Sequence, residues 1–573
     1  MLYNKIFDFV QKEFVFFVSF FVLLLQNTLM ARWFWTFGAL FQYVSLALFY
    51  SLLLSSFVFA LKSRLLKIIC YVSILMVCTL NVYLYLAFKT RISPNIFLLI
   101  GETNARESSE FLKEHLFSFP TLISFIFVFA IGIIILYAER HFRCAVKNYR
   151  LLTFVVFAIF VNGSYHFSTF LSLFKCQSST DIDRWVELYH AEPMDNCSNI
   201  IYCLYDLYVC GNELEKAHSA TIAAWERAAS TDMDSLNIVL VIGESHIKWH
   251  SSLYGYDKNT NPLLMNAKEK GNLFVFTDVY SPYNLTSNVL RNVFSTNCIG
   301  MDEKWFDYPF FPAIFRRAGY DVCFWDNQYD PKSYYCFDFS LNAYVHSQVN
   351  KKFAYSQSNG EIFEYDDELV SNFQKYIQKR GNPLKMIMFH LMGQHVYYCD
   401  RYPHGTGFDY FSSDSIPERW PFYSPSKRST IAHYDNATRY NDFVLNHIIT
   451  LFKNEKTVLV YFSDHGEEVY DFRDQEGRSL EKILENNVLK YQYQVPFFIW
   501  CSDKFIKESS QQVEQIRNAV NKPMTIDNVC HMLFNLGGIS TDYYVRKLDV
   551  LTSDYSCPPR IVNDSIDVDK MMQ

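Results

Sequence analysis

The sequence predicts a bundle of five membrane-spanning helices followed by an α/β domain with a doubly wound, largely parallel sheet. The first third of the 573-residue chain is strongly apolar, whereas the remainder has an ordinary mixed composition. In that remainder, apolar runs of strand length alternate with helical stretches such as 366–380 and 436–453, a pattern typical of sheets covered by helices. The net charge of -7 gives no reason to expect a nucleic acid partner.

Five segments are long enough to cross a hydrocarbon core of about 30 Å, which takes about 20 apolar residues in a helix. Lys and Arg are in excess in the connection between the second and third segments and in the one between the fourth and fifth. Lys5 and Lys12 precede the first segment. Because basic connections stay in the cytoplasm, the large C-terminal part is expected outside. The five segments are roughly 14–31, 37–60, 68–88, 118–138 and 151–174.

The changes in composition also predict the domain boundaries. The outward connection, 89–117, carries polar residues beside the apolar stretch 96–100, which fits either a solvated interfacial loop or a clamp for a lipid headgroup. The expected parts are a transmembrane domain at 1–174, a polar connector at 175–235, a catalytic domain at 236–557 and a C-terminal tail at 558–573.

Two of the apolar runs end in residues that suit a metal ion. Glu244 follows the run 236–243, and Asp464 and His465 follow the run 456–463. Both runs have the composition of buried parallel strands, and ligands collect at the carboxyl ends of such strands. Carboxylate and imidazole ligands suit zinc or manganese, and few protein ligands with an open position are typical of a catalytic site. A fourth ligand is still needed.

Thr286 is the candidate for the fourth ligand and for a nucleophile. It lies at or near the expected start of a helix, between the two ligand-bearing strands in the sequence. A hydroxyl there can also be a plain N-cap with no catalytic role. Coordination to a divalent metal would lower the pKa of the hydroxyl enough for nucleophilic attack at neutral pH. His246 and His250, four residues apart, lack the general base that accompanies helical metal pairs, so we interpret them as structural.

Three more polar residues follow predicted strands. Asn327 and Lys332 come after the run that starts at 320, and His395 comes after the run that starts at 385. Together they would offer cationic and hydrogen-bonding groups to the oxygens of a phosphoryl group. Each alone is also compatible with a structural role.

With these motifs the chain resembles membrane-bound phosphoethanolamine transferases of the alkaline phosphatase and sulfatase superfamily, which modify lipopolysaccharide. The resemblance covers nearly the whole chain, and the ordered set is specific although each motif is short. The motifs include Val-Ile-Gly-Glu-Ser at 241–245, Leu-Tyr-Gly-Tyr at 253–256, Thr-Asn-Pro at 260–262, Trp-Asp-Asn at 325–327, Gly-Gln-His at 393–395, Tyr-Asp-Asn at 434–436 and Ser-Asp-His-Gly-Glu-Glu-Val-Tyr-Asp at 463–471.

The resemblance implies an alkaline phosphatase-like catalytic domain in the periplasm, attached to the bacterial inner membrane. It implies that Thr286 takes phosphoethanolamine from phosphatidylethanolamine and passes it to lipopolysaccharide, at lipid A or the core, or to another glycolipid. The residues implied are Glu244, Thr286, Asp464 and His465 around zinc, with manganese as the alternative, Asn327, Lys332 and His395 at the transferred headgroup, and Asn104 and Glu107 near the lipid substrate.

The sequence departs from the family pattern at one position. Relatives commonly have a further histidine about a dozen residues after the Asp-His-Gly motif, and none occurs between 466 and 500. Arg473 or Arg478 could replace it as a cation, or His433 could come from elsewhere in the fold.

Two other functions are compatible with these motifs. One is a phosphoglycerol transferase of the lipoteichoic acid synthase type, which has the same five spans and a threonine nucleophile and uses manganese. The other is an inactive relative that senses lipid or acts as a scaffold. A plain sulfatase is disfavoured because the Cys/Ser-x-Pro-x-Arg motif needed to make formylglycine is absent from 281–298.

Overall fold

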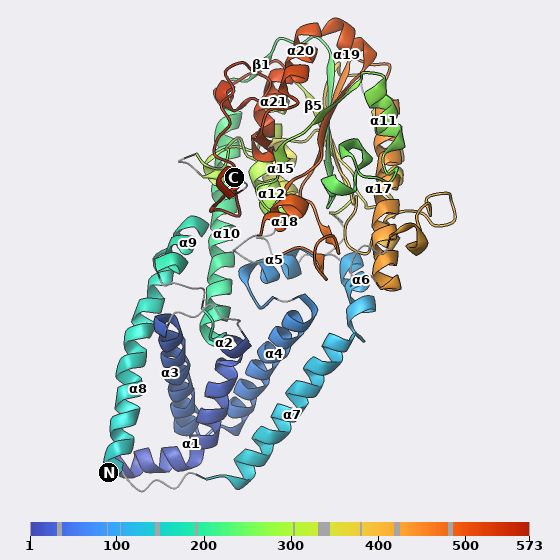
Figure 1. Ribbon diagram of the computed structural model, residues 1–573. Helices are drawn as coiled ribbons and strands as arrows, with labels where there is room; N and C mark the ends of the chain where they lie inside the picture. Colours follow the sequence, from blue (N-terminus) through green and yellow to red (C-terminus); the bar gives the residue numbers. More distant parts are fainter. Residues whose placement is uncertain are drawn as a thin grey trace. The chain divides into compact units, whose positions relative to one another are not determined.

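The chain forms two compact units, which meet in sequence between Glu213 and Leu214, inside helix α10 (Asn196–Trp225). Figure 1 shows the computed structural model, with a helical first unit and an α/β second unit. The structure describes residues 2–30, 37–88, 90–103, 105–143, 149–188, 193–301, 304–329, 344–378, 381–417, 424–479 and 485–571.

The first unit consists of helices, which is what its apolar, charge-poor sequence predicts. The outward connection that follows the second long helix contains two short helices, α5 and α6. The helices of this unit are α1 (Leu2–Leu24), α2 (Gln26–Met30), α3 (Phe37–Leu61), α4 (Arg64–Phe88), α5 (Pro94–Glu102), α6 (Ala105–His115), α7 (Phe119–His141), α8 (Tyr149–Phe170) and α9 (Ser179–Leu188), followed by α10.

Within the described residues, four helices are long and apolar enough to cross a membrane, so the expectation of five spans is wrong. The difference lies at the N-terminus, where the expected span 14–31 is divided between α1 and α2. The first half of α1 carries Lys5, Asp8, Lys12 and Glu13, which leaves only 14–24 as an uncharged stretch of this helix. The four spans are Leu40–Leu61, Arg64–Phe88, Phe119–His141 and Arg150–Lys175.

Helix α1 nevertheless packs with the membrane-type helices. Its buried Phe16 shares one apolar cluster with side chains of α3, α4 and α7. Lys67 of α4 lies 3.1 Å from Glu13 of α1 and 2.8 Å from Glu139 of α7, measured from Nζ to a carboxylate oxygen. Large apolar side chains such as Phe129 of α7 and Phe154 of α8 are exposed, as expected for helices that face lipid.

The second unit is built on a seven-stranded sheet in the order β3-β11-β8-β2-β7-β5-β6, which confirms the α/β class. β2 lies at the centre and runs parallel to both of its neighbours, β8 and β7. β11 is antiparallel to β8 and to β3. The strands are β2 (Leu236–Gly243), β3 (Leu273–Phe276), β5 (Asp321–Asp326), β6 (Gln357–Ser358), β7 (Leu384–His390), β8 (Thr457–Ser463) and β11 (Phe497–Cys501).

Helices cover both faces of this sheet (Figure 1). Val239 and Val241 of β2 belong to a buried cluster with Phe373 of α16 and Leu445 of α17. On the opposite face, Phe324 of β5 lies against Phe294 of α12, with ring centroids 6.1 Å apart. The helices are α11 (Pro262–Glu269), α12 (Thr286–Phe294), α13 (Phe311–Arg317), α16 (Asp366–Ile377), α17 (Pro425–Phe452) and α21 (Val529–Leu536).

The last residues of the chain are part of the second unit. β14 (Ile561–Val562) pairs with β15 (Ile566–Asp567), and α22 (Val568–Met571) follows. Val562 and Val568 are buried in a cluster with Tyr280 and Leu489. The described part of the segment after 557 is therefore folded.

Candidate active site

The two ligand-bearing strand ends lie side by side in the sheet. Gly243, the last residue of β2, is the register partner of Ser463, the last residue of β8. The backbone N–H of Asp464 donates to the carbonyl of Gly243 at 3.0 Å. Because both strands run in the same direction, Glu244 and Asp464 leave the sheet at the same edge.

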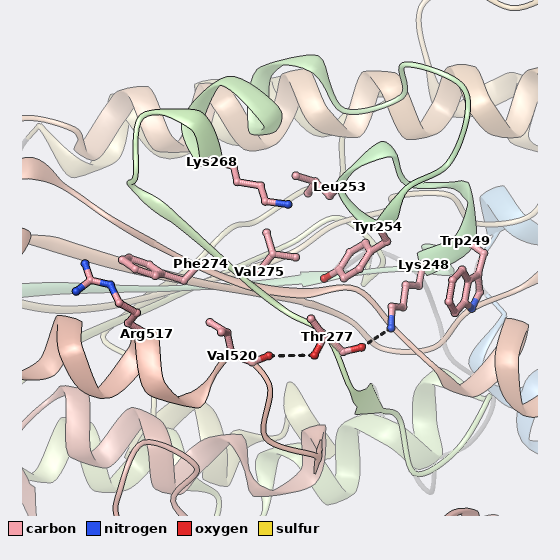
Figure 2. A pocket seen from close by; sticks show the side chains of 10 residues that line it. All are labelled: Lys248, Trp249, Leu253, Tyr254, Lys268, Phe274, Val275, Thr277, Arg517 and Val520. Atoms are coloured by element: carbon pink, nitrogen blue, oxygen red, sulfur yellow. Dashed lines mark hydrogen bonds between the residues drawn. The ribbon is translucent and has the colours of Figure 1, made fainter. Parts of the chain in front are cut away.

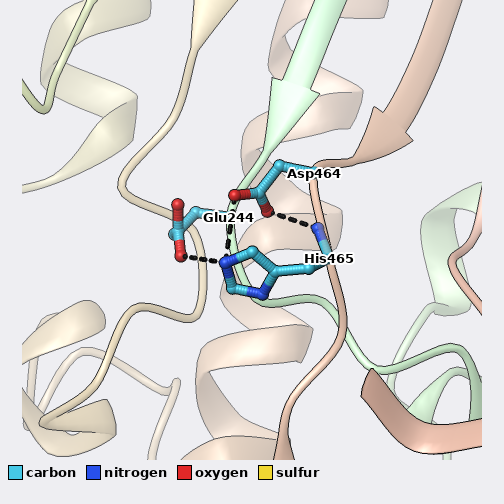
Figure 3. A group of neighbouring side chains, drawn as sticks. All are labelled: Glu244, Asp464 and His465. Atoms are coloured by element: carbon cyan, nitrogen blue, oxygen red, sulfur yellow. Dashed lines mark hydrogen bonds and ion pairs between the residues drawn. The ribbon is translucent and has the colours of Figure 1, made fainter. Parts of the chain in front are cut away.

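Glu244, Asp464 and His465 form a compact cluster of potential metal ligands (Figure 3). One ligand atom from each lies within 4.8 Å of the other two. His465 Nε2 is 3.1 Å from Asp464 Oδ2 and 3.4 Å from Glu244 Oε1. All three side chains are 0 % exposed.

Backbone groups fix the orientations of the Asp464 and His465 side chains. Asp464 Oδ1 accepts hydrogen bonds from the N–H groups of Ser245 (3.1 Å) and His465 (2.7 Å). Asp464 Oδ2 is buried and accepts no hydrogen bond from any residue that the structure describes. His465 Nδ1 lies 2.7 Å from the carbonyl of Gly466, so Nδ1 carries the proton and Nε2 keeps its lone pair.

Thr286 brings a hydroxyl to the same cluster. It is the first residue of α12, and its Oγ1 donates to Glu244 Oε2 at 3.0 Å. The same oxygen is 3.2 Å from His465 Nε2. The four predicted zinc ligands therefore lie together in the structure.

Burial makes this cluster electrostatically unfavourable without a cation. Burial raises the pKa of Asp464 well above its usual range, and the charge of Glu244 raises it further. Burial would also raise the pKa of Glu244, but the neighbouring His465, His395 and Arg478 bring it below its usual range, and of these Arg478 is charged at every pH. Burial and the adjacent Arg478 lower the pKa of His465 to about 3, so its imidazole is neutral and able to coordinate. Two buried carboxylates, a neutral imidazole and the free Asp464 Oδ2 fit a divalent cation such as zinc.

The predicted headgroup residues His395 and Asn327 have different surroundings in the structure. His395 lies close enough to contribute to the lowered pKa of Glu244. Asn327 is buried, and its amide donates to Asp366 Oδ1 (2.9 Å) and accepts from the N–H of Phe363 (2.7 Å). Asn104 and Lys332 lie outside the described residues, and so does the side chain of Glu107, which belongs to α6.

Gln328 reaches the cluster although the sequence analysis did not select it. Its Nε2 donates to Glu244 Oε2 at 3.1 Å and to the carbonyl of Leu391 at 2.8 Å. The signal in the sequence was its position directly after the polar end of a strand, next to Asn327.

Among the candidates to replace the missing histidine, the structure brings Arg478 to the cluster. Its Nη1 lies 2.8 Å from His465 Nε2. Arg473 instead donates to both carboxylate oxygens of Glu468 at 2.9 and 3.1 Å. His433 Nδ1 is 2.7 Å from the Tyr402 hydroxyl.

A pocket of about 550 Å³ lies elsewhere in the second unit (Figure 2). Trp249, Tyr254 and Lys248 line it, and Lys248 Nζ donates to the carbonyl of Thr277 at 2.6 Å. None of the four predicted zinc ligands is among its lining residues.

The protein-family model described as "Sulfatase" matches residues 236–539, more than half of the chain. The chain belongs to the sulfatase family. This sulfatase-family chain is 26% identical over 474 residues to phosphoethanolamine transferase EptC of Escherichia coli (strain K12), covering 80% of this chain and 78% of the relative. It is 26% identical over 282 residues, 49% of this chain and 46% of the relative, to the Kdo(2)-lipid A phosphoethanolamine 7''-transferase of the same strain.

Two solved structures are similar to this sulfatase-family chain. The C-terminal periplasmic domain of EptC from Escherichia coli, in complex with zinc, is 27% identical with a TM-score of 0.51 and covers 60% of this chain and 96% of that chain. The integral membrane protein lipooligosaccharide phosphoethanolamine transferase A from Neisseria meningitidis is 17% identical with a TM-score of 0.60, covering 95% of this chain and 97% of that chain. The second likeness extends the shared fold through the membrane unit. The resemblance to membrane-bound phosphoethanolamine transferases is confirmed.

Proposed function

We propose that this chain transfers phosphoethanolamine from phosphatidylethanolamine to lipopolysaccharide or a related glycolipid, through a covalent intermediate on Thr286. The observation that carries this proposal is the convergence of one hydroxyl with two buried carboxylates and a neutral imidazole at the carboxyl edge of a parallel sheet. The names of the similar EptC and lipid A transferases support the group transferred and the class of acceptor.

The metal in this proposal is zinc, held by Glu244, Thr286, Asp464 and His465. The zinc complex of the Escherichia coli EptC domain supports this choice, and nothing comparable supports manganese. Zinc in this position would lower the pKa of the Thr286 hydroxyl and offset the negative charge of the phosphoryl oxygens.

The first half-reaction forms a bond between Thr286 Oγ1 and the phosphorus atom, and breaks the bond between phosphorus and the glycerol oxygen. The proton lost by the Thr286 hydroxyl is balanced by the proton gained by the leaving diacylglycerol. In the second half-reaction an acceptor hydroxyl or phosphate displaces Thr286, which regains a proton. The fixed contact of Oγ1 with Glu244 would orient the hydroxyl for the attack.

Asn327, Lys332 and His395 are proposed to bind the headgroup, and Asn104 and Glu107 to approach the lipid. We place the enzyme in the inner membrane with its second unit in the periplasm. The four apolar helices and the periplasmic origin of the similar EptC domain support this location.

A transfer assay on the full-length purified protein tests the function. Phosphatidylethanolamine labelled in its headgroup is supplied with lipopolysaccharide. The label is expected in lipopolysaccharide, and unlabelled diacylglycerol is expected in an equal amount. Chelation should abolish the reaction and zinc should restore it. Transfer from phosphatidylglycerol instead would favour a phosphoglycerol transferase, and no turnover of either donor by zinc-loaded protein would favour an inactive relative.

A further inference from the structure

Arg478 is held beside His465 by a short hairpin. It directly follows β10 (Glu476–Gly477), which pairs antiparallel with β9 (Glu468–Val469) just after the predicted ligands. The next residue, Ser479, donates its N–H to Gln492 Oε1 at 2.8 Å, and its carbonyl accepts from Asn284 Nδ2 at 2.7 Å. These contacts fix the backbone at Arg478 against the loop that leads into Thr286.

The guanidinium of Arg478 uses the same lone pair that a metal would need. Nη1 donates to His465 Nε2 at 2.8 Å, and only 18% of the side chain is exposed. His465 Nδ1 carries the one N–H proton of the neutral ring, so Nε2 has a single lone pair to offer. A guanidinium keeps its proton in proteins, so Arg478 and a metal ion cannot bind Nε2 at the same time.

A second acceptor for Arg478 lies close by. Glu467 is 1% exposed, and its Oε1 is buried without a hydrogen-bond partner in the described part of the chain. Its other oxygen, Oε2, accepts from the Ser245 hydroxyl at 3.4 Å and is 3.8 Å from Arg478 Nε. A small movement of the guanidinium would turn this long ion pair into a direct one. That movement would free His465 Nε2 and bring a positive charge into direct contact with a buried carboxylate.

We propose that Arg478 moves from His465 to Glu467 when zinc binds and then holds the oxygens of the phosphoryl group on Thr286. This inference rests on the proposed function. It assigns to Arg478 the place of the further histidine that relatives have and this chain lacks. Glu467 is the positioning residue, because it holds one edge of the guanidinium and leaves other N–H groups for the phosphoryl oxygens. An arginine suits this role since its planar fork binds phosphate oxygens in pairs. It cannot donate the proton that the leaving diacylglycerol needs, so its contribution is to charge and orientation only.

The test measures zinc affinity and formation of the Thr286 adduct separately in full-length protein. Zinc affinity is measured without lipid, by competition with a chromophoric chelator. Arg478→Gln should bind zinc about tenfold more tightly, because one competing charged hydrogen bond is lost. With saturating zinc and phosphatidylethanolamine, the same variant should form the adduct about 100-fold more slowly, as expected when one donor to the phosphoryl oxygens is removed.

Two other variants make the result specific. Glu467→Gln should also slow adduct formation but should weaken zinc binding, because Arg478 then has no charged acceptor to move to. Arg473→Gln is the matched control, since Arg473 pairs with Glu468, and both quantities should stay at wild-type values.

A general loss of structure would lower both quantities together, so opposite changes in Arg478→Gln support the proposal. Zinc affinity at or below the wild-type value in Arg478→Gln, or adduct formation at the wild-type rate, would overturn it. If wild-type protein forms no adduct at all, the proposed function is wrong, and so is the proposal that Arg478 holds the phosphoryl oxygens. The zinc measurements still decide whether Arg478 competes for His465.

Discussion

Single residues outside the cluster of Glu244, Asp464 and His465 connect the segments around it, and His250 is an example. Its Nδ1 is 2.7 Å from Asp435 Oδ1 of α17, and its Nε2 is 2.8 Å from Asp471 Oδ1. Asp471 in turn accepts from the N–H of Val469 in β9 at 3.0 Å. His250 therefore ties α17 to the segment that follows Asp464 and His465.

We predict that His250→Gln destabilises the second unit and removes part of its pH dependence. Burial would lower the pKa of His250, but Asp471 and Asp435 outweigh it and raise the pKa to about 10. The folded-state pKa lies above the unfolded value of about 6.5, so the stabilisation is complete below pH 6.5 and is lost as the pH rises towards 10. Removing one partner of a buried charged pair costs about 3–5 kcal/mol. Thermal unfolding followed by fluorescence from pH 6 to 10 measures both effects.

His404→Gln is the control, because His404 is 51% exposed in its pair with Asp409 and its loss should change stability by about 0.5 kcal/mol or less. An unfolding midpoint that falls with pH as steeply in His250→Gln as in the wild type would contradict this assignment.

The sequence was most informative about residues at the ends of strands. Glu244, Asp464 and His465 could be selected because each follows a buried apolar run directly, and the parallel register then brings them together. The choice between Arg473 and Arg478 could not be made, since it depends on how the β9–β10 hairpin returns to the sheet. Asn327 and Gln328 are adjacent, and only the twist of the chain after β5 decides which amide faces Glu244.

At the scale of elements, the loop after β7 packs against the backbone of Glu244. Gly393 has a φ of 50°, and a Cβ at this position would lie 2.8 Å from the carbonyl oxygen of Glu244 and 2.9 Å from its nitrogen. The N–H of the next residue, Gln394, donates to the same carbonyl at 3.0 Å. The motif around Gly393 was visible in the sequence, but this close approach depends on the register of β2 against β7.

We predict that Gly393→Ala weakens zinc binding by about tenfold, because strain of about 1–3 kcal/mol would be relieved by displacing Glu244. Gly381→Ala is the matched control, since a Cβ there meets no atom of the described residues within 4 Å. The zinc affinity of both variants is measured by competition with a chelator. Equal zinc affinities in the two variants would show that the loop does not position the ligand.

Element boundaries were predicted less well than strand ends. Helix α17 begins at Pro425, directly after its N-cap Ser424, whereas a start at 436 was expected. The sequence did not reveal these first turns because they lack apolar periodicity. The expected first membrane span is wrong because α1 carries charged residues and ends at Leu24.

At the scale of the whole molecule, we predict that the second unit is periplasmic and that the α3–α4 connection is cytoplasmic. Lys62, Arg64 and Lys67 lie in or beside this connection without an acidic residue among them, and basic connections are retained in the cytoplasm. A reporter active only in the periplasm should be active when fused after the C-terminus and inactive when inserted after Ser63. Activity at Ser63 would reverse the proposed orientation.

The mass of the peptide that contains Thr286 tests the central claim most directly. Protein isolated from its native membrane, or incubated with phosphatidylethanolamine, should carry a phosphoethanolamine adduct on Thr286, and Thr286→Ala should carry none. A phosphoglycerol adduct would show that the donor is phosphatidylglycerol and not phosphatidylethanolamine. Zinc-loaded protein that leaves both Thr286 and the lipid unchanged would contradict the account.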